Sequence, residues 1–357
     1  MQIKWKRIFT NFLLAQVITN GVYGFTFVQN ISGRHNIILQ IINGSLDSND
    51  FSLDSPLNYL IPAYFGLQNL DYYLLFTFII TQISLFIICV LISSLGKNSY
   101  LFFFAGWLVP ATWYLGYADM LTVALTLLIL HEIVNNRGRN LYKIIFFCLL
   151  LTINHSALAL GLLLIIFFLN EDGYKLNYLK ITFPTYVLGF LINQQLKSFV
   201  GFSGRGRFRF LLNDGVIADS LDIIRTNFLD VFYSGFLGLI IIFIMTILLN
   251  KSLAYNKMYV PILISIIFSC IALDTSRIFS ILLVPTIFLI IKEYENINFE
   301  NTLSSTAVLI SVVGINLIVG VRHVYGFSRN KSPFIDEPNI YELIIKFLNS
   351  IFANILA

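Results

Sequence analysis

The stretch IIFFCLLLTINHSALALGLLLIIFFL, residues 144–169, consists of two apolar runs separated by Asn154-His155-Ser156. The runs cover residues 144–155 and 157–169, and as helices they would be about 18 and 20 Å long at 1.5 Å per residue. The hydrocarbon core of a bilayer is about 30 Å thick. Two helices this short would meet part-way through a membrane, and such a turn must be buried in protein or line a watery cavity. The stretch therefore predicts a recessed polar corner in an all-α membrane fold.

The composition of the whole chain agrees with a membrane protein. Of 357 residues, 57% are apolar and only 12% are charged, whereas a soluble domain has roughly 25% charged residues. The net charge of +4 is small and dispersed, which argues against a nucleic-acid partner. The composition excludes a single soluble domain, a disordered tail protein and a nucleic-acid binder.

Further apolar runs predict one transmembrane domain over residues 1–357, a polytopic helical bundle of about eleven spans at roughly 20 residues per span. We expect these spans at residues 8–28, 72–95, 101–117, 120–134, 144–155, 157–169, 181–199, 233–249, 258–273, 278–291 and 303–321. The stretch from Ile340 to Leu356 has apolar residues at helical spacing but carries Glu342 and Lys346. It predicts an interfacial helix, not another span.

Basic residues in alternate short loops predict the orientation, because such loops stay in the cytoplasm. They place the N-terminus in the cytoplasm and the C-terminus outside. The outer face then carries a first loop (29–71), a second loop (200–232) and a tail (322–357). Thirteen of the nineteen acidic residues fall on this face, so we expect the chemistry there. The basic residues are Lys4, Lys6, Arg7, Lys97, Arg137, Arg139, Lys143, Lys175, Lys180, Lys251, Lys257 and Lys292.

Three short outer corners carry polar residues, and each has a structural and a functional interpretation. Asp119 is either the cap of the helix at 120–134 or a substrate ligand. His155 is either a packing residue or a donor to an anionic oxygen, since ionisable groups inside a membrane are costly. Asp274 and Arg277, three residues apart, either pair on one helix face or bind a phosphate through the guanidinium, with Asp274 orienting it.

The two outer loops hold the remaining candidates. Asp47 and Asp50 lie in the first loop, where a carboxylate either accepts a proton from a hydroxyl, holds a cation, or only stabilises a turn. Arg205 and Arg207 alternate with Gly and Phe at the start of the second loop. They either cradle a lipid phosphate or pyrophosphate or adhere to anionic headgroups.

Cysteine usage adds little to these candidates. Cys89, Cys148 and Cys270 all lie inside apolar runs, which predicts buried free thiols and neither a disulfide nor a metal site.

This layout resembles the GT-C class of membrane glycosyltransferases, which take sugar from a polyprenyl-phosphate carrier. Asn49-Asp50-Phe51 matches the acidic part of that class's first outer loop. The corners Tyr117-Ala118-Asp119, Asn154-His155-Ser156 and Asp274-Thr275-Ser276-Arg277 look similar to polar corners in bacterial relatives of the class. Many members carry an additional soluble outer domain, and this chain has no such domain, which leaves the acceptor and the metal requirement open.

The resemblance implies a multi-pass protein of the bacterial inner (plasma) membrane that uses a lipid-linked sugar as donor. The acceptor would be a glycan, a lipid or a protein, and membrane lipids would surround the protein. Asp50 would be the catalytic base, with Asp47 second, and His155 would assist the leaving group. No cofactor is implied with certainty, and a divalent cation, Mg²⁺ or Mn²⁺, is left open. The expected substrate-binding residues are Asp119, Arg205, Arg207, Asp274 and Arg277.

Three other functions fit parts of the same pattern. A polymerase or ligase of polyprenyl-diphosphate-linked glycans would also use outer arginines and a histidine. A flippase or transporter of lipid-linked glycans would need polar residues in the cytoplasmic half of the spans, where Gln82, His131 and Glu132 are among the few. A structural assembly subunit would have its polar corners far apart.

Overall fold

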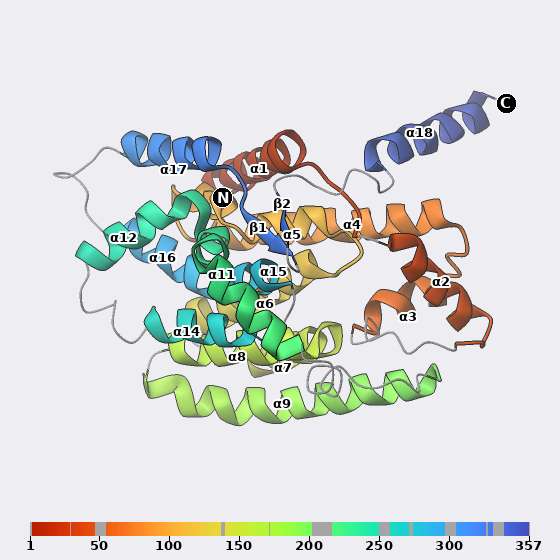
Figure 1. Ribbon diagram of the computed structural model, residues 1–357, viewed down its shortest axis with the longest axis horizontal. Coiled ribbons are helices and arrows are strands. Elements are labelled where there is room, and N and C mark those ends of the chain that lie inside the picture. Colours follow the sequence, from red (N-terminus) through yellow and green to blue (C-terminus); the bar gives the residue numbers. More distant parts are fainter. Residues whose placement is uncertain are drawn as a thin grey trace.

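The computed structural model describes residues 2–28, 30–46, 55–136, 140–170, 172–201, 216–249, 258–270, 274–296, 305–325, 328–330 and 339–356. Within these residues the chain is all-α apart from one antiparallel hairpin, β1 (His323–Tyr325) with β2 (Ser328–Asn330) (Figure 1). The sixteen α-helices of these residues are α1 (Gln2–Val17), α2 (Ile31–Ile42), α3 (Leu57–Tyr64), α4 (Leu70–Ile92), α5 (Leu108–Trp113), α6 (Asp119–Asn136), α7 (Leu141–Asn154), α8 (Ser156–Leu169), α9 (Asp172–Phe199), α11 (Val216–Phe236), α12 (Ile240–Leu249), α14 (Tyr259–Ser269), α15 (Thr275–Leu282), α16 (Val284–Asn296), α17 (Ser305–Val319) and α18 (Ile340–Leu356).

Helix α6 forms the centre of the bundle. It is buried on nearly all sides, as expected for a helix whose apolar residues are not confined to one stripe. Helices α4, α5, α7 and α16 pack against it. Helix α9 covers α7 and α8 from outside and runs along one long edge of the molecule (Figure 1).

Two stretches of the described chain are long and apolar enough to cross a membrane: Leu70–Ile92 and Ile217–Leu248. The pair Thr275–Leu282 and Val284–Glu295, bent by 43°, would make a third. The structure therefore shows an all-α protein with two or three candidate spans, and it does not show an eleven-span bundle. Shorter apolar helices account for further predicted runs, namely Leu141–Asn154, Ser156–Leu169, Tyr259–Ser269 and Thr306–Val319.

The predicted turn between two short helices at Asn154-His155-Ser156 is confirmed, and its recessed position in a membrane stays a prediction. Helix α7 ends at Asn154 and α8 begins at Ser156, and each has 14 residues. At 1.5 Å per residue each is about 21 Å long, which is shorter than a hydrocarbon core of about 30 Å. Any span built from these two helices would therefore turn before it crosses.

The predicted span at 101–117 is wrong as a single helix. The chain forms a 3₁₀-helix over Ser99–Phe104, turns, and continues as the short helix α5. Gly106 lies in this turn and donates its N–H to the Gly235 carbonyl at 3.1 Å. A Cβ atom on Gly106 would lie 1.5 Å from the Ser234 carbonyl oxygen, so only glycine allows this close approach.

The predicted outer loops contain helices. Helices α2 and α3 lie within 29–71 and pack against each other, and α11 begins at Val216, within 200–232. The side chain of Asn30 caps α2 by accepting the Gly33 N–H at 3.3 Å, which is a preferred role of Asn at a helix start. The predicted C-terminal helix is confirmed as α18, which projects from the body of the molecule (Figure 1).

Candidate functional site

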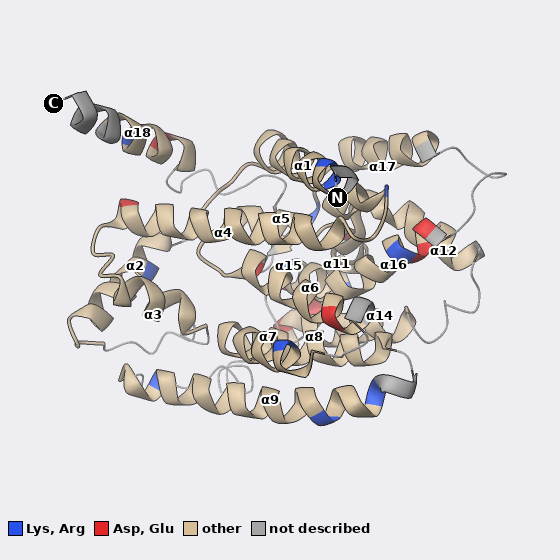
Figure 2. Cartoon of the chain, turned by 180° about the vertical axis from the view of Figure 1, so that it is seen from behind, with Lys and Arg blue, Asp and Glu red and all other residues tan. Residues whose placement is uncertain are grey.

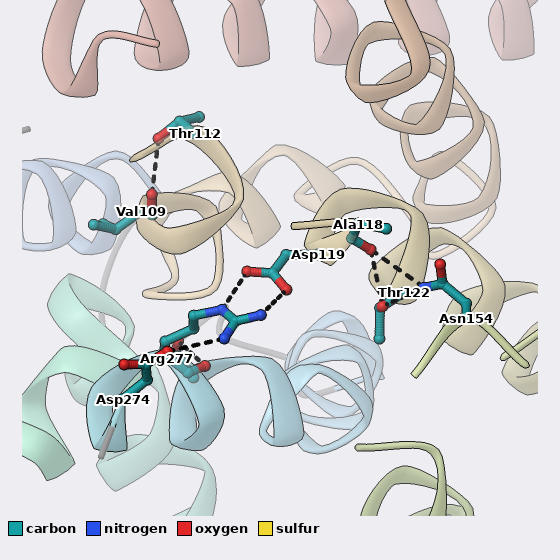
Figure 3. A network of polar contacts seen from close by, with 9 residues as sticks. Val109, Thr112, Ala118, Asp119, Thr122, Asn154, Asp274 and Arg277 are labelled. Atoms are coloured by element: carbon teal, nitrogen blue, oxygen red, sulfur yellow. Dashed lines mark hydrogen bonds and ion pairs between the residues drawn. The ribbon is translucent and has the colours of Figure 1, made fainter. Parts of the chain in front are cut away.

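Two of the three predicted corners meet in a cluster of charged side chains (Figure 3). Asp119 begins α6, and Arg277 lies in the first turn of α15. Arg277 donates from Nε to Asp119 Oδ2 at 2.7 Å and from Nη2 to Asp119 Oδ1 at 2.8 Å. It also donates from Nη1 to Asp274 Oδ2 at 3.1 Å. Of the two interpretations of their spacing, the pairing of Asp274 with Arg277 is observed, and Asp119 is a second partner 158 residues away in sequence.

These contacts compensate the cost of burying charged side chains. The side chains of Arg277 and Asp119 are each 2% exposed, and that of Asp274 is 16% exposed. Removing such charges from water costs several kcal/mol per ion, and a two-bond guanidinium–carboxylate contact is among the strongest available compensations. Two carboxylates against one guanidinium leave a formal charge of −1 on the three side chains. Asp274 is the member of the cluster that solvent or a substrate reaches most easily.

The ring of Tyr117 extends the cluster to the first predicted loop. The Arg277 guanidinium carbon lies 3.8 Å from the centre of this ring, and the Arg34 guanidinium carbon lies 4.1 Å from it. Both distances are in the range of favourable cation–π contacts. Arg34, from α2, also donates to the Tyr59 hydroxyl of α3 at 2.9 Å. Tyr117 belongs to the predicted corner Tyr117-Ala118-Asp119, whereas the contact of Arg34 with it was not predicted, because no local spacing links residues so far apart.

The third corner joins the same end of α6 (Figure 3). Asn154, at the end of α7, donates to the Thr122 hydroxyl at 2.9 Å. Thr122 lies one turn after Asp119 and donates to the Ala118 carbonyl at 2.9 Å. Asn193 of α9 donates to the Ile153 carbonyl at 3.2 Å. The Asn154 side-chain oxygen is buried and accepts no hydrogen bond within the described part of the chain. All three corners thus converge on the first turns of α6.

His155 has a structural contact that was not considered from the sequence. Its ring is at the same corner and is 6% exposed, and Nδ1 accepts the Leu158 N–H at 3.4 Å, at the start of α8. A ring nitrogen that accepts a hydrogen bond is unprotonated, so protonation of Nδ1 would remove this cap. A role for His155 in assisting a leaving group stays a prediction.

An apolar cleft of about 550 Å³, which includes its open mouth, lies beside the cluster. Tyr117 and Ala118 form part of its wall, next to Asp119. Two threonines in the wall, Thr77 and Thr81, donate their hydroxyls to carbonyls of their own helix, so their donors are already used. The other lining residues are Leu57, Asn58, Ile61, Tyr73, Phe76, Ile80, Gly116, Met120 and Leu121. Such a wall suits a hydrocarbon chain better than a sugar.

Four predicted site residues, Asp47, Asp50, Arg205 and Arg207, lie outside the described residues. The described chain nevertheless shows where their segments begin. Gly201 has a positive φ of 81°, and a Cβ placed on it would lie 4.0 Å from the Leu46 carbonyl oxygen. Leu46 and Gly201 therefore lie close together.

Metal and thiol chemistry gain no support from the part of the chain that the structure describes. No group of three or more His, Cys, Asp or Glu side chains there could hold a metal ion. Cys89 and Cys148 are buried free thiols, as predicted, and Cys270 is a free thiol that is only partly buried.

Comparison of the chain with known protein families, characterised proteins and solved structures finds no match.

Proposed function

We propose that the protein is a membrane glycosyltransferase that moves a sugar from a polyprenyl-phosphate-linked donor to an acceptor on the extracytoplasmic face, with inversion at the sugar carbon. The observation that carries the proposal is the convergence of Asp119, Asn154 and the Asp274–Arg277 pair on the start of α6. A structural assembly subunit would not require three costly polar corners to meet beside an apolar cleft.

The proposal includes the membrane arrangement. In the proposed arrangement a bundle of about eleven membrane segments includes the two or three candidate spans and the shorter apolar helices, with the N-terminus in the cytoplasm of a bacterial inner membrane. In this arrangement the three corners open outward. The candidate spans and the short α7–α8 hairpin support it.

The cleft beside Tyr117 suits the lipid part of the donor. Its wall is apolar and its two threonine hydroxyls are already bonded within α4. A hydrocarbon chain in this cleft would bring the phosphate close to the turn that carries Asp119.

The charges around Arg277 indicate that it has a different role from Arg205 and Arg207. Because Arg277 already bonds two carboxylates, its charge is compensated and it serves to hold Asp274 in place. Arg205 and Arg207 then bind the donor phosphate, because forked guanidinium groups match phosphate oxygens. They also stabilise the negative charge that develops on the phosphate as its bond to the sugar breaks. Asp50 takes the proton from the acceptor hydroxyl, and Asp274 orients that hydroxyl.

The test uses the purified chain in proteoliposomes with labelled sugars on polyprenyl monophosphate and polyprenyl diphosphate. The account predicts turnover of the monophosphate donor and none in the folded Asp50→Asn variant. The exposed Asp219 of α11 supplies a matched control, Asp219→Asn, which keeps full activity. Turnover of the diphosphate donor alone would favour the polymerase or ligase, and movement of label across the bilayer without transfer would favour the flippase. A fully active Asp50→Asn protein removes Asp50 as the base.

A further inference from the structure

A second pair of opposite charges lies outside the cluster, where α18 packs against the beginning of α4 (Figure 2). Asp71 is in the first turn of α4, and Lys346 is on α18. Both line an open pocket of about 510 Å³, a volume that includes its mouth. The other lining residues are Asn69, Tyr72, Leu75, Leu343 and Phe347.

The two charges of this pocket are exposed and apart. Among the described residues, neither Asp71 nor Lys346 forms an ion pair. The Asn69 side chain accepts the Asp71 N–H at 2.7 Å, so the Asp71 backbone is capped and its carboxylate is not needed for that purpose. The pocket thus presents one carboxylate and one ammonium group that do not neutralise each other.

The position of the pocket suits the surface of a membrane. Helix α4 is a candidate span, so its first turn would stand at the membrane–water boundary. Tyr72 is 56% exposed there, and tyrosine is enriched at that boundary. Helix α18 buries Leu343 and exposes Ile345 and Leu348, as an amphipathic helix in the interface would.

Helix α18 is also tied to the body of the protein. The Tyr341 hydroxyl donates to the Asn20 side-chain oxygen at 3.0 Å, and Ile340 is fully buried. The pocket wall that α18 supplies is therefore held against α4 and is not an isolated helix face.

We propose that this pocket binds the headgroup of a zwitterionic phospholipid, phosphatidylethanolamine. Its phosphate lies against Lys346, its ammonium group lies against Asp71, and its acyl chains pass along Leu75 and Phe347. A lipid with both charges satisfies both side chains, whereas an anionic lipid leaves Asp71 unpaired next to a second negative charge. This inference does not depend on the glycosyltransferase proposal.

The experiment counts lipids retained by the purified full-length chain in native mass spectrometry, after titration with dioleoyl phosphatidylethanolamine or dioleoyl phosphatidylglycerol. Wild type should retain phosphatidylethanolamine in preference to phosphatidylglycerol. Asp71→Asn should lower this preference by about fivefold, the effect of one exposed ion pair. Lys346→Gln should weaken the binding of both lipids, because both carry the phosphate.

A control variant and a double variant with the two charges exchanged test whether the lipid preference depends on Asp71 and Lys346. Glu342→Gln, also exposed on α18 but outside the pocket lining, should leave the preference unchanged. Asp71→Lys combined with Lys346→Asp should restore the preference for phosphatidylethanolamine that either exchange alone removes. Equal retention of the two lipids by wild type, stronger retention of phosphatidylglycerol, or an unchanged preference in Asp71→Asn would each overturn the proposal.

Discussion

At the start of α6, Arg277 and its two carboxylates touch one another, and two of the three side chains are almost fully buried. In the pocket between α4 and α18, Asp71 and Lys346 face the same space without pairing, and both are exposed. Charges that satisfy one another in a dry place hold the chain together, because separating them leaves a buried ion. Charges held apart at the surface contribute little to the fold and leave their bonding capacity for a ligand. Substitutions in the Arg277 cluster and in the pocket between α4 and α18 test this difference between buried and exposed charges.

The largest effect is expected for Arg277→Met. The change leaves Asp119 and Asp274 without their cation, and removing one partner of a buried pair typically costs about 3–5 kcal/mol. The free energy of unfolding of the purified protein, measured by denaturant titration in detergent, should fall by this amount. A loss below about 1 kcal/mol would mean that water reaches the cluster. The cluster would then not differ from the exposed charges of the pocket.

Tyr117→Leu is expected to have the next largest effect. It removes a ring that lies under two guanidinium groups, and each such contact is worth about 0.5–2 kcal/mol. The expected loss is about 1–4 kcal/mol by the same titration. The matched control is Tyr117→Phe, which keeps the ring and should stay within about 0.5 kcal/mol of wild type. Equal losses in both variants would show that the hydroxyl, not the ring, matters.

An intermediate case is the pair of Arg322 with Asp230, in which Arg322 Nη1 lies 3.3 Å from Asp230 Oδ1. The Asp230 side chain is 5% exposed, but that of Arg322 is 50% exposed. Solvent screens the arginine, so Arg322→Met should lower the free energy of unfolding by about 1 kcal/mol. A loss as large as that of Arg277→Met would show that exposure of one partner does not weaken such a pair.

The smallest effect on stability is expected for Asp71→Asn and Lys346→Gln. Neither side chain has an ion partner in the described chain, and surface changes usually stay within about 0.5 kcal/mol. The melting temperature without added lipid should therefore match that of wild type. A clear loss of stability without lipid would mean that these charges serve the fold.

Several elements could be read from the sequence because their signals are local. The corner at Asn154-His155-Ser156 interrupts two apolar runs, and the chain turns there. The contact of Asp274 with Arg277 was one of two interpretations of their spacing, because three residues bring two side chains to one helix face. The helix at Ile340–Leu356 followed from its apolar spacing.

The turn within 101–117 and the long-range contacts of the site could not be predicted, because they depend on residues far apart in sequence. The run at 101–117 is mostly apolar, yet the chain turns at Gly106, where its backbone passes close to that of Ser234. Asp119 could be recognised as a helix start, but nothing near it in sequence identifies Arg277 as its partner. Arg34 and Arg277 reach the Tyr117 ring for the same reason, through packing between distant segments.

The central claim is that the charges around Arg277 both hold the corners together and serve the reaction. The most direct measurement compares Arg277→Met with the triple variant Asp119→Asn, Asp274→Asn, Arg277→Met, in unfolding and in sugar transfer from the polyprenyl-phosphate donor. The triple variant leaves no buried charge without a partner, so it should regain most of the stability that Arg277→Met loses, yet transfer no sugar. A stable triple variant that transfers sugar at the wild-type rate would contradict the account.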